Sequence, residues 1–452
     1  MRQKERSRQG RPRGWARRVV YAAYIINALA IVGFWWASSG FESTRSWSDF
    51  FNGAGRVSGL LGTYMVLWQL VLLSRTGWLE KAWGLEKEVV LHKWNGYGAL
   101  LLLLVHAGTQ TVGYELGDGM SVMSQLGAFV GNYPGVLAAM VALGLMAVVV
   151  VMSVGMARRR MKYETWYFIH LYAYMGVVLA FSHQLATGVD FAGNPAFVGY
   201  WIALYGITAW ILLWSRLGGV LRKHQKHALK VAGVTKEAKG VFSIYISGRN
   251  LQDLKAEAGQ AAWWRFMDSK RWWQAHPFSI SDRTDGKRLR ITVKNIGDFT
   301  REIHNLKVGT PVLMEGPFGK FIERGEGEKV LLVAGGIGIT PLRALAEEML
   351  EEGLDVHLIY RVHSEGDIVF KQELEALKAK GLKIDYSLGT GTKKTSREAW
   401  VRPESLAKWV EDVAEREAWV CGPKEMTEAV VESLLEAGVK RGQIQTEVFR
   451  LQ

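Results

Sequence analysis

The chain has 452 residues and a formal net charge of +13, so it is too long for one ordinary domain and basic enough to raise the question of nucleic-acid binding. Much of the positive charge lies in the first eighteen residues and in short runs beside apolar segments, such as residues 158–160. This distribution is typical of membrane anchoring and argues against a nucleic-acid-binding face. The single cysteine, Cys421, excludes an intrachain disulfide framework and a cysteine-ligated iron–sulfur cluster.

The N-terminal half contains apolar segments of the length that crosses a bilayer, which is about 20 residues. The six predicted spans are residues 19–37, 57–74, 89–113, 135–156, 165–186 and 195–215. The basic residues before the first span are not followed by a convincing small-residue cleavage site. We therefore interpret this segment as a retained span and not as a signal peptide.

The distribution of Lys and Arg among the connecting segments predicts the orientation of the spans. Residues 111–134 and 183–200 contain neither amino acid, whereas residues 157–164 and the stretch after Arg216 contain several. By the positive-inside rule, the N-terminus and everything after Arg216 face the cytoplasm. We expect a multi-pass protein of the plasma membrane, embedded in the lipid bilayer, with both termini in the cytoplasm.

Two predicted spans each carry a pair of histidines. His92 and His106 lie in the third span, and His170 and His183 lie in the fifth. Ionisable groups inside a bilayer are costly and usually functional, although a lone histidine more often makes an interhelical hydrogen bond. The separations of 14 and 13 residues, about 21 and 20 Å of helix rise, place one histidine of each span near each membrane surface. The pattern favours two layers in which facing imidazoles supply both axial ligands of a haem iron, over a zinc or copper site with clustered ligands.

The two separations return to different faces of a helix. At about 100° per residue, 14 residues bring a side chain back to within about 40° of its starting face, whereas 13 residues leave it about 140° away. We therefore expect a bend or a π-bulge in the fifth span between His170 and His183.

The chain after Arg216 has the pattern of two soluble domains. Short apolar runs up to about residue 322 predict a small antiparallel β-barrel. From Lys329 onward, strand-like runs alternate with amphipathic helices, which predicts a parallel, doubly wound α/β sheet. The expected parts of this multidomain membrane protein are a basic cytosolic segment, a six-helix transmembrane bundle, a β-barrel domain and an α/β domain, at residues 1–18, 19–216, 217–322 and 323–452.

A glycine-rich turn follows the first strand of the predicted α/β domain. Its residues Gly335, Gly336 and Gly338 let a pyrophosphate approach the backbone closely, with Thr340 expected as the N-cap and Pro341 as the first residue of the next helix. Such a turn alone is weak support for dinucleotide binding, but its place between a strand and a helix strengthens that interpretation.

Several short motifs, in their order along the chain, resemble those of the ferric reductase and NADPH oxidase superfamily. Residues 276–281 (HPFSIS) resemble the flavin-binding motif of the family's ferredoxin–NADP reductase-like module, and residues 297–300 (GDFT) resemble its flavin pyrophosphate turn. Residues 258–260 match the strand that precedes the HPFSIS motif in the family. Residues 315–319 (EGPFG) resemble a further flavin-binding element, and residues 420–423 (VCGP) resemble the family's motif on the nicotinamide side. The membrane histidines match the family's bis-haem core. Together these features cover nearly the whole chain after the basic N-terminal segment.

The resemblance implies two haem b groups, FAD and NADPH as cofactors, with NADH as an alternative to NADPH. The four membrane histidines would hold the haems. The implied FAD-binding residues are Gln260, His276, Pro277, Phe278, Ser279, Ser281, Lys294, Gly297, Thr300, Gly316 and Gly319. The implied dinucleotide-binding residues are Gly335, Gly336, Gly338, Thr340, Pro341, Arg361, His363, Cys421, Gly422 and Pro423. Packing alternatives stay open, with Phe278 as a core residue, Thr300 as a helix cap and Cys421 as a small buried hydrophobe.

Two positions depart from the family pattern. Where the family often has an arginine that pairs with the 2′-phosphate of NADPH, this chain has His363, with Arg361 two residues earlier. Arg361 offers bidentate pairing, but the choice of NADPH over NADH is weakened. Family members also tend to end in an aromatic residue that stacks on the flavin, and here either Phe449 or Leu451 takes that place.

The resemblance implies an oxidoreductase that moves electrons from cytosolic NADPH through FAD and two b-type haems to oxygen on the outer side, producing superoxide. Residues with an implied catalytic role are Arg56, Cys421 and Phe449. Arg56, at the outer start of the second span, would attract superoxide or a haem propionate, and an interfacial anchor is the alternative.

Two other functions stay open. A transmembrane ferric-chelate reductase is the second hypothesis, for which Glu115 and Asp118 in an outer loop offer carboxylates to a cationic complex. The third is an electron-donor subunit for a membrane or extracytoplasmic partner, against which the short outer loops argue. We expect no nucleic-acid partner and no obligatory activator protein.

Overall fold

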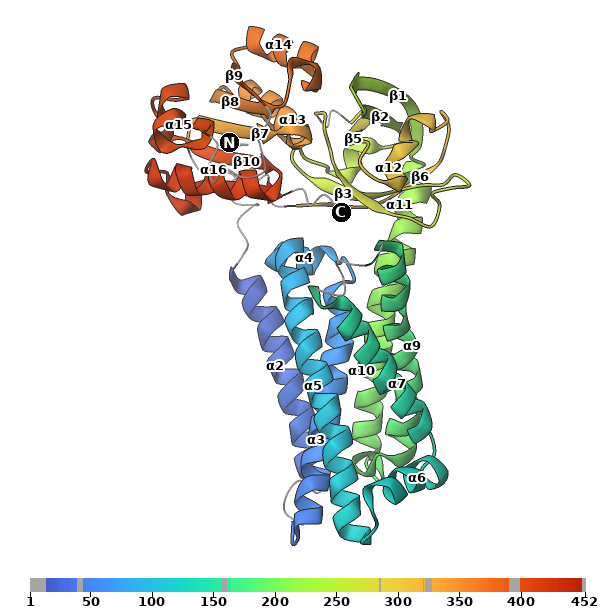
Figure 1. Ribbon diagram of the computed structural model, residues 1–452. Coiled ribbons are helices and arrows are strands. Elements are labelled where there is room, and N and C mark those ends of the chain that lie inside the picture. Colours follow the sequence, from blue (N-terminus) through green and yellow to red (C-terminus); the bar gives the residue numbers. More distant parts are fainter. Residues whose placement is uncertain are drawn as a thin grey trace. The chain divides into compact units, whose positions relative to one another are not determined.

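The computed structural model describes residues 14–38, 44–155, 161, 163–283, 286–319, 321, 327–389 and 399–448. The chain divides into two compact units, a helical unit that ends at Leu217 and a second unit of strands and helices that begins at Gly218 (Figure 1).

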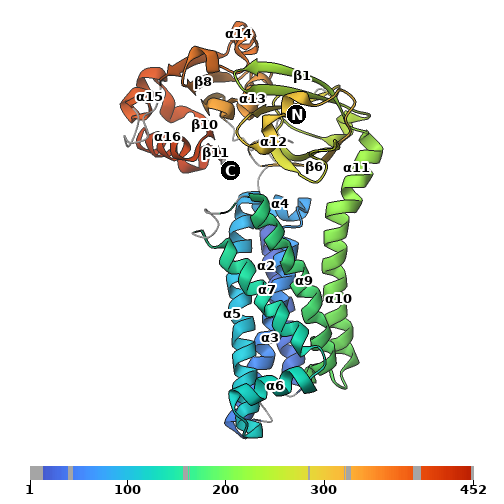
Figure 2. The ribbon, with the colours of Figure 1, turned by 45° about the vertical axis from the view of Figure 1, so that its right-hand side comes forward.

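The helical unit consists mainly of long helices that lie side by side (Figure 1, Figure 2). Its helices are α2 (Gly14–Ser38), α3 (Trp47–Leu72), α4 (Gly77–Trp83), α5 (Leu85–Asp118), α6 (Val122–Asn132), α7 (Val136–Ser153), α9 (Tyr163–Thr187) and α10 (Pro195–Leu213). A π-helical turn, η2 (Trp214–Gly218), leads from α10 into α11 (Gly219–His227).

Four segments of the described chain are long and apolar enough to cross a bilayer. They are Gly14–Ser38, Val136–Ser153, Glu164–Thr187 and Pro195–His227. Helices α3 and α5 overlap the other two predicted spans, but glycines, amides and histidines interrupt their apolar runs. Because these two helices fall outside the set of four, the six-span arrangement stays a prediction.

Helix α3 packs against α5 through a row of glycines. A Cβ atom added to Gly55 would lie 2.3 Å from Gln110 Nε2, and one added to Gly59 would lie 2.6 Å from His106 Nδ1. Small residues let two helices approach closely in a membrane. The row therefore brings the backbone of α3 against the side of α5 that carries His106.

The first part of the second unit is antiparallel, as predicted. One sheet has the order β1 (Lys230–Ala238), β2 (Val241–Ser247), β5 (Leu289–Lys294), and the other has the order β4 (His276–Ser279), β3 (Ala261–Phe266), β6 (Val312–Phe318). Bridges between Lys230 and Pro311 and between Ile280 and Ile291 join the edges of the two sheets. Alternate side chains such as Trp264 and Phe266 are buried between the sheets, which gives this part its own core.

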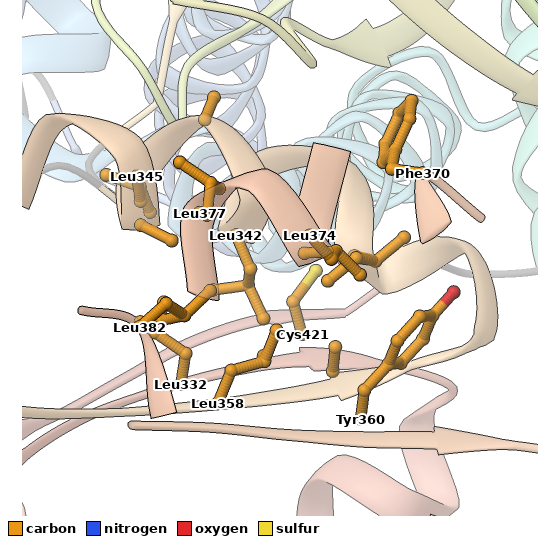
Figure 3. Close-up of a cluster of buried hydrophobic side chains, with 14 of the residues drawn as sticks. Leu332, Leu342, Leu345, Leu358, Tyr360, Phe370, Leu374, Leu377, Leu382 and Cys421 are labelled. Atoms are coloured by element: carbon orange, nitrogen blue, oxygen red, sulfur yellow. The ribbon is translucent and has the colours of Figure 1, made fainter. Parts of the chain in front are cut away.

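The second part is a parallel sheet, which confirms the predicted architecture. Its strand order is β11 (Ile444–Val448), β10 (Glu417–Gly422), β7 (Lys329–Gly335), β8 (Asp355–Val362), β9 (Lys383–Leu388). Helices α13 (Ile339–Glu351) and α14 (Lys371–Ala379) pack on one face, and α15 (Pro403–Trp409) and α16 (Lys424–Glu436) pack on the other. Figure 3 shows part of the first core, where Leu342, Leu358 and Leu374 gather beside Cys421. The edge strand β11 was not predicted, because its polar sequence IQTEV is only partly buried.

Candidate functional site

The structure brings the four membrane histidines together as two pairs. We name His92 and His170 the inner pair, and His106 and His183 the outer pair, after the predicted orientation. The ring centroids of the inner pair are 5.9 Å apart at an interplanar angle of 45°, and those of the outer pair are 6.4 Å apart at 41°. Each pair joins α5 to α9, as the sequence pattern predicted.

The second ring nitrogen of the α5 histidines meets a backbone carbonyl of α3. His92 Nδ1 lies 3.2 Å from the carbonyl oxygen of Gln69, and His106 Nδ1 lies 2.8 Å from that of Gly55. A carbonyl can only accept a hydrogen bond, so the proton of each neutral ring lies on Nδ1. The free electron pair is then on Nε2.

The α9 histidines are fixed in the same tautomer by different partners. His183 Nδ1 lies 2.5 Å from the carbonyl oxygen of Ala180, and His170 Nδ1 lies 3.3 Å from Ser153 Oγ. The Ser153 hydroxyl donates to the Val149 carbonyl at 2.7 Å, so its oxygen is left to accept from His170. Trp166 Nε1 donates to the same oxygen at 3.1 Å. Neither Ser153 nor Trp166 was predicted, although a serine and a tryptophan near the end of a span are a usable signal.

The donor set fits bis-histidine haem ligation. Metal-bound histidines typically donate their other ring N–H to a carbonyl or similar acceptor, as all four do here. Two imidazole nitrogens that each bind one iron at about 2 Å from opposite sides place their ring centres about 6 Å apart. Within the described part of the chain, no group of three or more His, Cys, Asp or Glu side chains could hold a metal ion, which leaves the two-ligand pairs.

Of the expected bend or π-bulge between His170 and His183, the π-bulge is wrong, because α9 is α-helical from Tyr163 to Thr187. The side chains take up the angular offset instead. His170 turns towards Ser153 on α7, whereas His183 turns back to Ala180 on its own helix. The two rings therefore leave α9 in different directions without a break in its backbone.

The predicted flavin motif forms strand β4 and stacks on an aromatic residue of another segment. The His276 ring lies 3.9 Å from the Phe299 ring at 29°, and the Phe278 ring lies 6.2 Å from it. Pro277 is exposed on the same strand. Ser279 Oγ is buried without a hydrogen-bond partner among the described residues, so a polar group of a bound ligand would satisfy it. Phe299 lies in the GDFT motif, but no role was predicted for it.

Other predicted flavin residues have structural partners. Ser281 is fully buried, and its Oγ lies 2.8 Å from Thr292 Oγ1 inside the barrel. Thr300 Oγ1 accepts hydrogen bonds from the backbone N–H groups of Ile296 and Gly297, both at 3.0 Å, so it caps the turn. Lys294 is exposed at the end of β5.

The EGPFG turn is supported from helix α11. Gly316 and Gly319 have φ values of +120° and +115°, which favour glycine. Lys223 Nζ donates a hydrogen bond to the Gly316 carbonyl. Gln260 directly precedes strand β3, and its Oε1 accepts from the Glu257 N–H at 3.0 Å. The turn is thus fixed in a conformation that only glycine adopts readily.

The glycine-rich turn after β7 is packed on one side and open on the other. A Cβ atom on Gly335 would lie 2.5 Å from Met426 Sδ, and one on Gly338 would lie 2.1 Å from the Cys421 carbonyl oxygen. Gly336, with φ of +53°, has no atom within 4 Å of the added Cβ. The turn therefore fits a pyrophosphate that approaches at Gly336.

The predicted start of the following helix is wrong. A 3₁₀ turn over Gly336–Gly338 runs directly into α13, whose first residue is Ile339. Thr340 therefore lies inside the helix, where its Oγ1 donates to the Ile337 carbonyl at 3.0 Å, and Pro341 follows it.

The VCGP segment lies against this turn, but its thiol points into the core. The Cys421 side chain is fully buried among leucines (Figure 3), and burial, with a smaller effect of Glu447, raises the pKa of its thiol. A Cβ atom on Gly422 would lie 3.1 Å from the Gly335 Cα, and one on Gly335 would lie 3.0 Å from Pro423 Cδ. The backbone of this segment lines the turn, and the arrangement favours a packing role for the thiol.

Arg361 lies at the carboxyl end of β8, the edge where doubly wound sheets bind ligands. Its Nη1 lies 3.3 Å from Ser387 Oγ, and its guanidinium lies 5.7 Å from the centre of the Trp400 ring. His363 is exposed just beyond the strand. Of these two residues, Arg361 has the partners that would hold its charge in place for a phosphate.

Within the helical unit, Arg56 of α3 forms an ion pair with Asp190. Its Nη1 lies 3.1 Å from Asp190 Oδ1, in the short turn between α9 and α10. The Asp190 side chain is 4% exposed, so the pair is largely shielded from solvent. Phe449 and Leu451 lie outside the described residues.

Three family models match successive parts of the chain. The ferric reductase like transmembrane component matches residues 58–181, the FAD-binding domain matches residues 226–321, and the oxidoreductase NAD-binding domain matches residues 332–432. Their order is that of the predicted transmembrane, flavin and nucleotide domains.

The chain is also similar to individual proteins. A flavohemoprotein of Pseudomonas putida is 26% identical over 293 residues, which are 62% of this chain and 74% of that protein. A probable dihydroorotate dehydrogenase B (NAD(+)), electron transfer subunit, of Methanothermobacter thermautotrophicus is 32% identical over 214 residues, 47% of this chain and 74% of the relative. The FAD/NAD binding domain of a nitric oxide dioxygenase from Vibrio cholerae is 23% identical with a TM-score of 0.42, covering 49% of this chain and 98% of that structure.

Proposed function

Because the chain belongs to the ferric reductase and NADPH oxidase superfamily, we propose that it is a transmembrane NADPH oxidase, which moves electrons from cytosolic NADPH to oxygen on the outer side and produces superoxide. At a coarser level, it is a membrane oxidoreductase of ferric reductase type that passes electrons from NAD(P)H through FAD. The oxidase proposal adds two b-type haems, oxygen as the acceptor, and a plasma membrane location with cytoplasmic termini.

The observation that carries the proposal is the arrangement of the two histidine pairs. In each pair, imidazole rings on two helices lie with their centroids 5.9 or 6.4 Å apart, close to the separation expected when two histidines hold one iron, and every Nδ1 has an acceptor. Both histidines of a pair would hold the same haem, so each pair would supply a group that passes electrons and does not bind the acceptor. The arrangement favours electron transfer to an acceptor outside the coordination sphere of the metal.

The residues of the second unit have distinct tasks in this proposal. When bound, FAD takes a hydride from NADPH and gives up its electrons singly, which is how haem iron accepts them. The Ser279 hydroxyl and the stacked rings of His276 and Phe299 orient the flavin, and the turn at Gly336 receives the pyrophosphate of NADPH. Arg361 selects the 2′-phosphate by charge.

A transmembrane ferric-chelate reductase is the second candidate. The name of the matched transmembrane model favours it, and Asp118 is exposed at the end of α5, where a cationic complex would approach. A donor subunit for another protein is the third, since one relative is named an electron transfer subunit.

The acceptor is tested on the detergent-purified full-length chain supplied with FAD. NADPH-driven reduction of cytochrome c is followed with and without superoxide dismutase. We expect dismutase to suppress the reduction and no activator protein to be needed. If dismutase does not suppress the reduction of cytochrome c and the chain turns over rapidly on ferric chelates, the oxidase proposal is wrong and the ferric-chelate reductase is favoured.

A further inference from the structure

Two side-chain amides connect helices α2, α3 and α5 beside the inner histidine pair. Gln69 of α3 donates from its side-chain Nε2 to the backbone carbonyl of His92 at 2.7 Å. The backbone carbonyl of Gln69 in turn faces His92 Nδ1. Asn95 of α5 donates from Nδ2 to Gln69 Oε1 at 2.7 Å and to the Met65 carbonyl at 2.8 Å. Tyr24 of α2 donates to Asn95 Oδ1 at 3.3 Å.

These contacts leave neither amide group unsatisfied. Gln69 uses both its oxygen and its nitrogen, and Asn95 uses its oxygen once and its nitrogen twice. Polar side chains among apolar helices are costly unless their polar atoms find partners, and a network in which they do is rigid. The network therefore fixes Gln69 and Asn95 in one arrangement.

The backbone of α5 is shaped to admit this network. A Cβ atom on Gly96 would lie 2.7 Å from Gln69 Nε2, so a glycine at this position makes room for the amide to lie across α5. At the outer pair, His106 Nδ1 also meets a carbonyl of α3, but the nearby amide of Gln110 donates to the Asn52 carbonyl at 2.9 Å and not to the main chain of a histidine. Among the described residues, His92 alone of the four histidines has both contacts: its ring Nδ1 meets a backbone carbonyl, and its own backbone carbonyl accepts a hydrogen bond from a side-chain amide.

We propose that Gln69 and Asn95 form an amide clamp that positions His92 for metal binding, so that the clamp sets the properties of the inner haem selectively. The clamp holds the Gln69 carbonyl against the ring N–H of His92 and thereby fixes the tautomer and direction of that ring. A hydrogen bond at this nitrogen makes the imidazole a stronger donor and favours ferric over ferrous iron. Gln69 and Asn95 are positioning residues, because they act through His92. This inference rests on the proposed function.

Loss of the clamp is expected to raise the midpoint potential of one haem. Partners of metal ligands typically change metal affinity by about 10- to 100-fold when mutated. A tenfold weaker preference for ferric iron raises a one-electron potential by about 59 mV. The other haem should keep its potential, because its ligands have other partners.

The experiment is a potentiometric titration of the full-length chain in detergent, followed by the optical spectrum. The variants are Gln69→Leu and Asn95→Leu, with Tyr24→Phe as a milder change that removes only the hydroxyl bound to Asn95. The matched control is Asn27→Leu, which removes an amide of α2 that bonds to Tyr200 and is not linked to His92. The titration is expected to show one reduction step for each haem, and the step that is lost in His92→Ala identifies the inner haem.

We expect Gln69→Leu and Asn95→Leu to raise the midpoint potential of the inner haem alone, and Tyr24→Phe to raise it less. We expect Asn27→Leu to leave the midpoint potentials of both haems unchanged. If either leucine variant fails to fold, the remaining variants still decide, because Tyr24→Phe keeps the ring and changes only one bond. Unchanged potentials, or equal shifts of both steps, would overturn the clamp. A wild-type chain without haem would instead refute the proposed function. That result differs from a chain with two haems whose midpoint potentials do not change in the clamp variants.

Discussion

Gly338→Ala is expected to destabilise the nucleotide-binding part of the chain without straining its own backbone. Gly338 has φ of −61°, which alanine adopts freely, but the added Cβ would lie 2.1 Å from the Cys421 carbonyl oxygen. Real Cβ atoms stay at least 3.0 Å from such an atom, so the two turns must separate by about 1 Å. Overpacking of this kind costs about 1–3 kcal/mol.

The measurement is thermal unfolding together with the rate of NADPH-driven flavin reduction. A unit of the size of residues 218–452 loses about 2–4 °C in Tm per kcal/mol. A displacement of about 1 Å in a site that positions reactants costs about 100-fold in rate. The matched control is Gly336→Asn, since asparagine tolerates the left-handed φ of +53° and the space beside Gly336 is open. We expect the control to unfold like the wild type but to bind NADPH more weakly. Wild-type stability of Gly338→Ala would refute the close approach of the two turns.

Three further predictions concern the same unit. Cys421→Ala should keep the rate of flavin reduction within a few-fold, because the thiol is buried; a large loss of rate would restore its catalytic role. Arg361→Ala should raise KM for NADPH about 10-fold or more and leave KM for NADH unchanged, as expected for a lost charge-assisted contact; equal effects on both would remove Arg361 from the phosphate site. The hydrogen bond from Arg416 lowers the pKa of Asp412 to about 2. This ion pair should therefore stabilise the fold above pH about 4 and lose its contribution as pH falls towards about 2, and Asp412→Asn should flatten that part of the unfolding profile.

Much of the fold could be predicted because its elements have strong periodicity. The central strands β7, β8 and β10 are nearly continuous apolar runs, and they occur where the sequence placed them. Strand β11 was missed because an edge strand buries only part of its side chains. The α13 start was misplaced because the positive φ of Gly336 begins a 3₁₀ turn that continues into the helix.

The site was predictable where patterns within single segments indicate it, and not where a contact depends on how two segments pack together. Facing histidines follow from similar spacings of 14 and 13 residues on two helices, so both pairs were predicted. Phe299 stacks on His276 from another segment, and Gln69 reaches His92 from another helix. Local patterns cannot indicate such contacts, although an amide inside an apolar helix is a signal worth following.

Side-chain freedom explains the one geometric error in the membrane unit. A rule of about 100° per residue places Cβ atoms, but a histidine ring extends beyond its Cβ and can turn about χ1. His170 and His183 use this freedom to meet partners on α5 from an unbroken helix.

The central claim is that the two histidine pairs hold two b-type haems. It is tested most directly by the dithionite-reduced optical spectrum and the haem content of the purified chain, compared with His92→Ala and His106→Ala. The account predicts about two haems per wild-type chain with a b-type spectrum, and loss of one haem in each variant. A wild-type chain without haem, or variants that keep both, would contradict it.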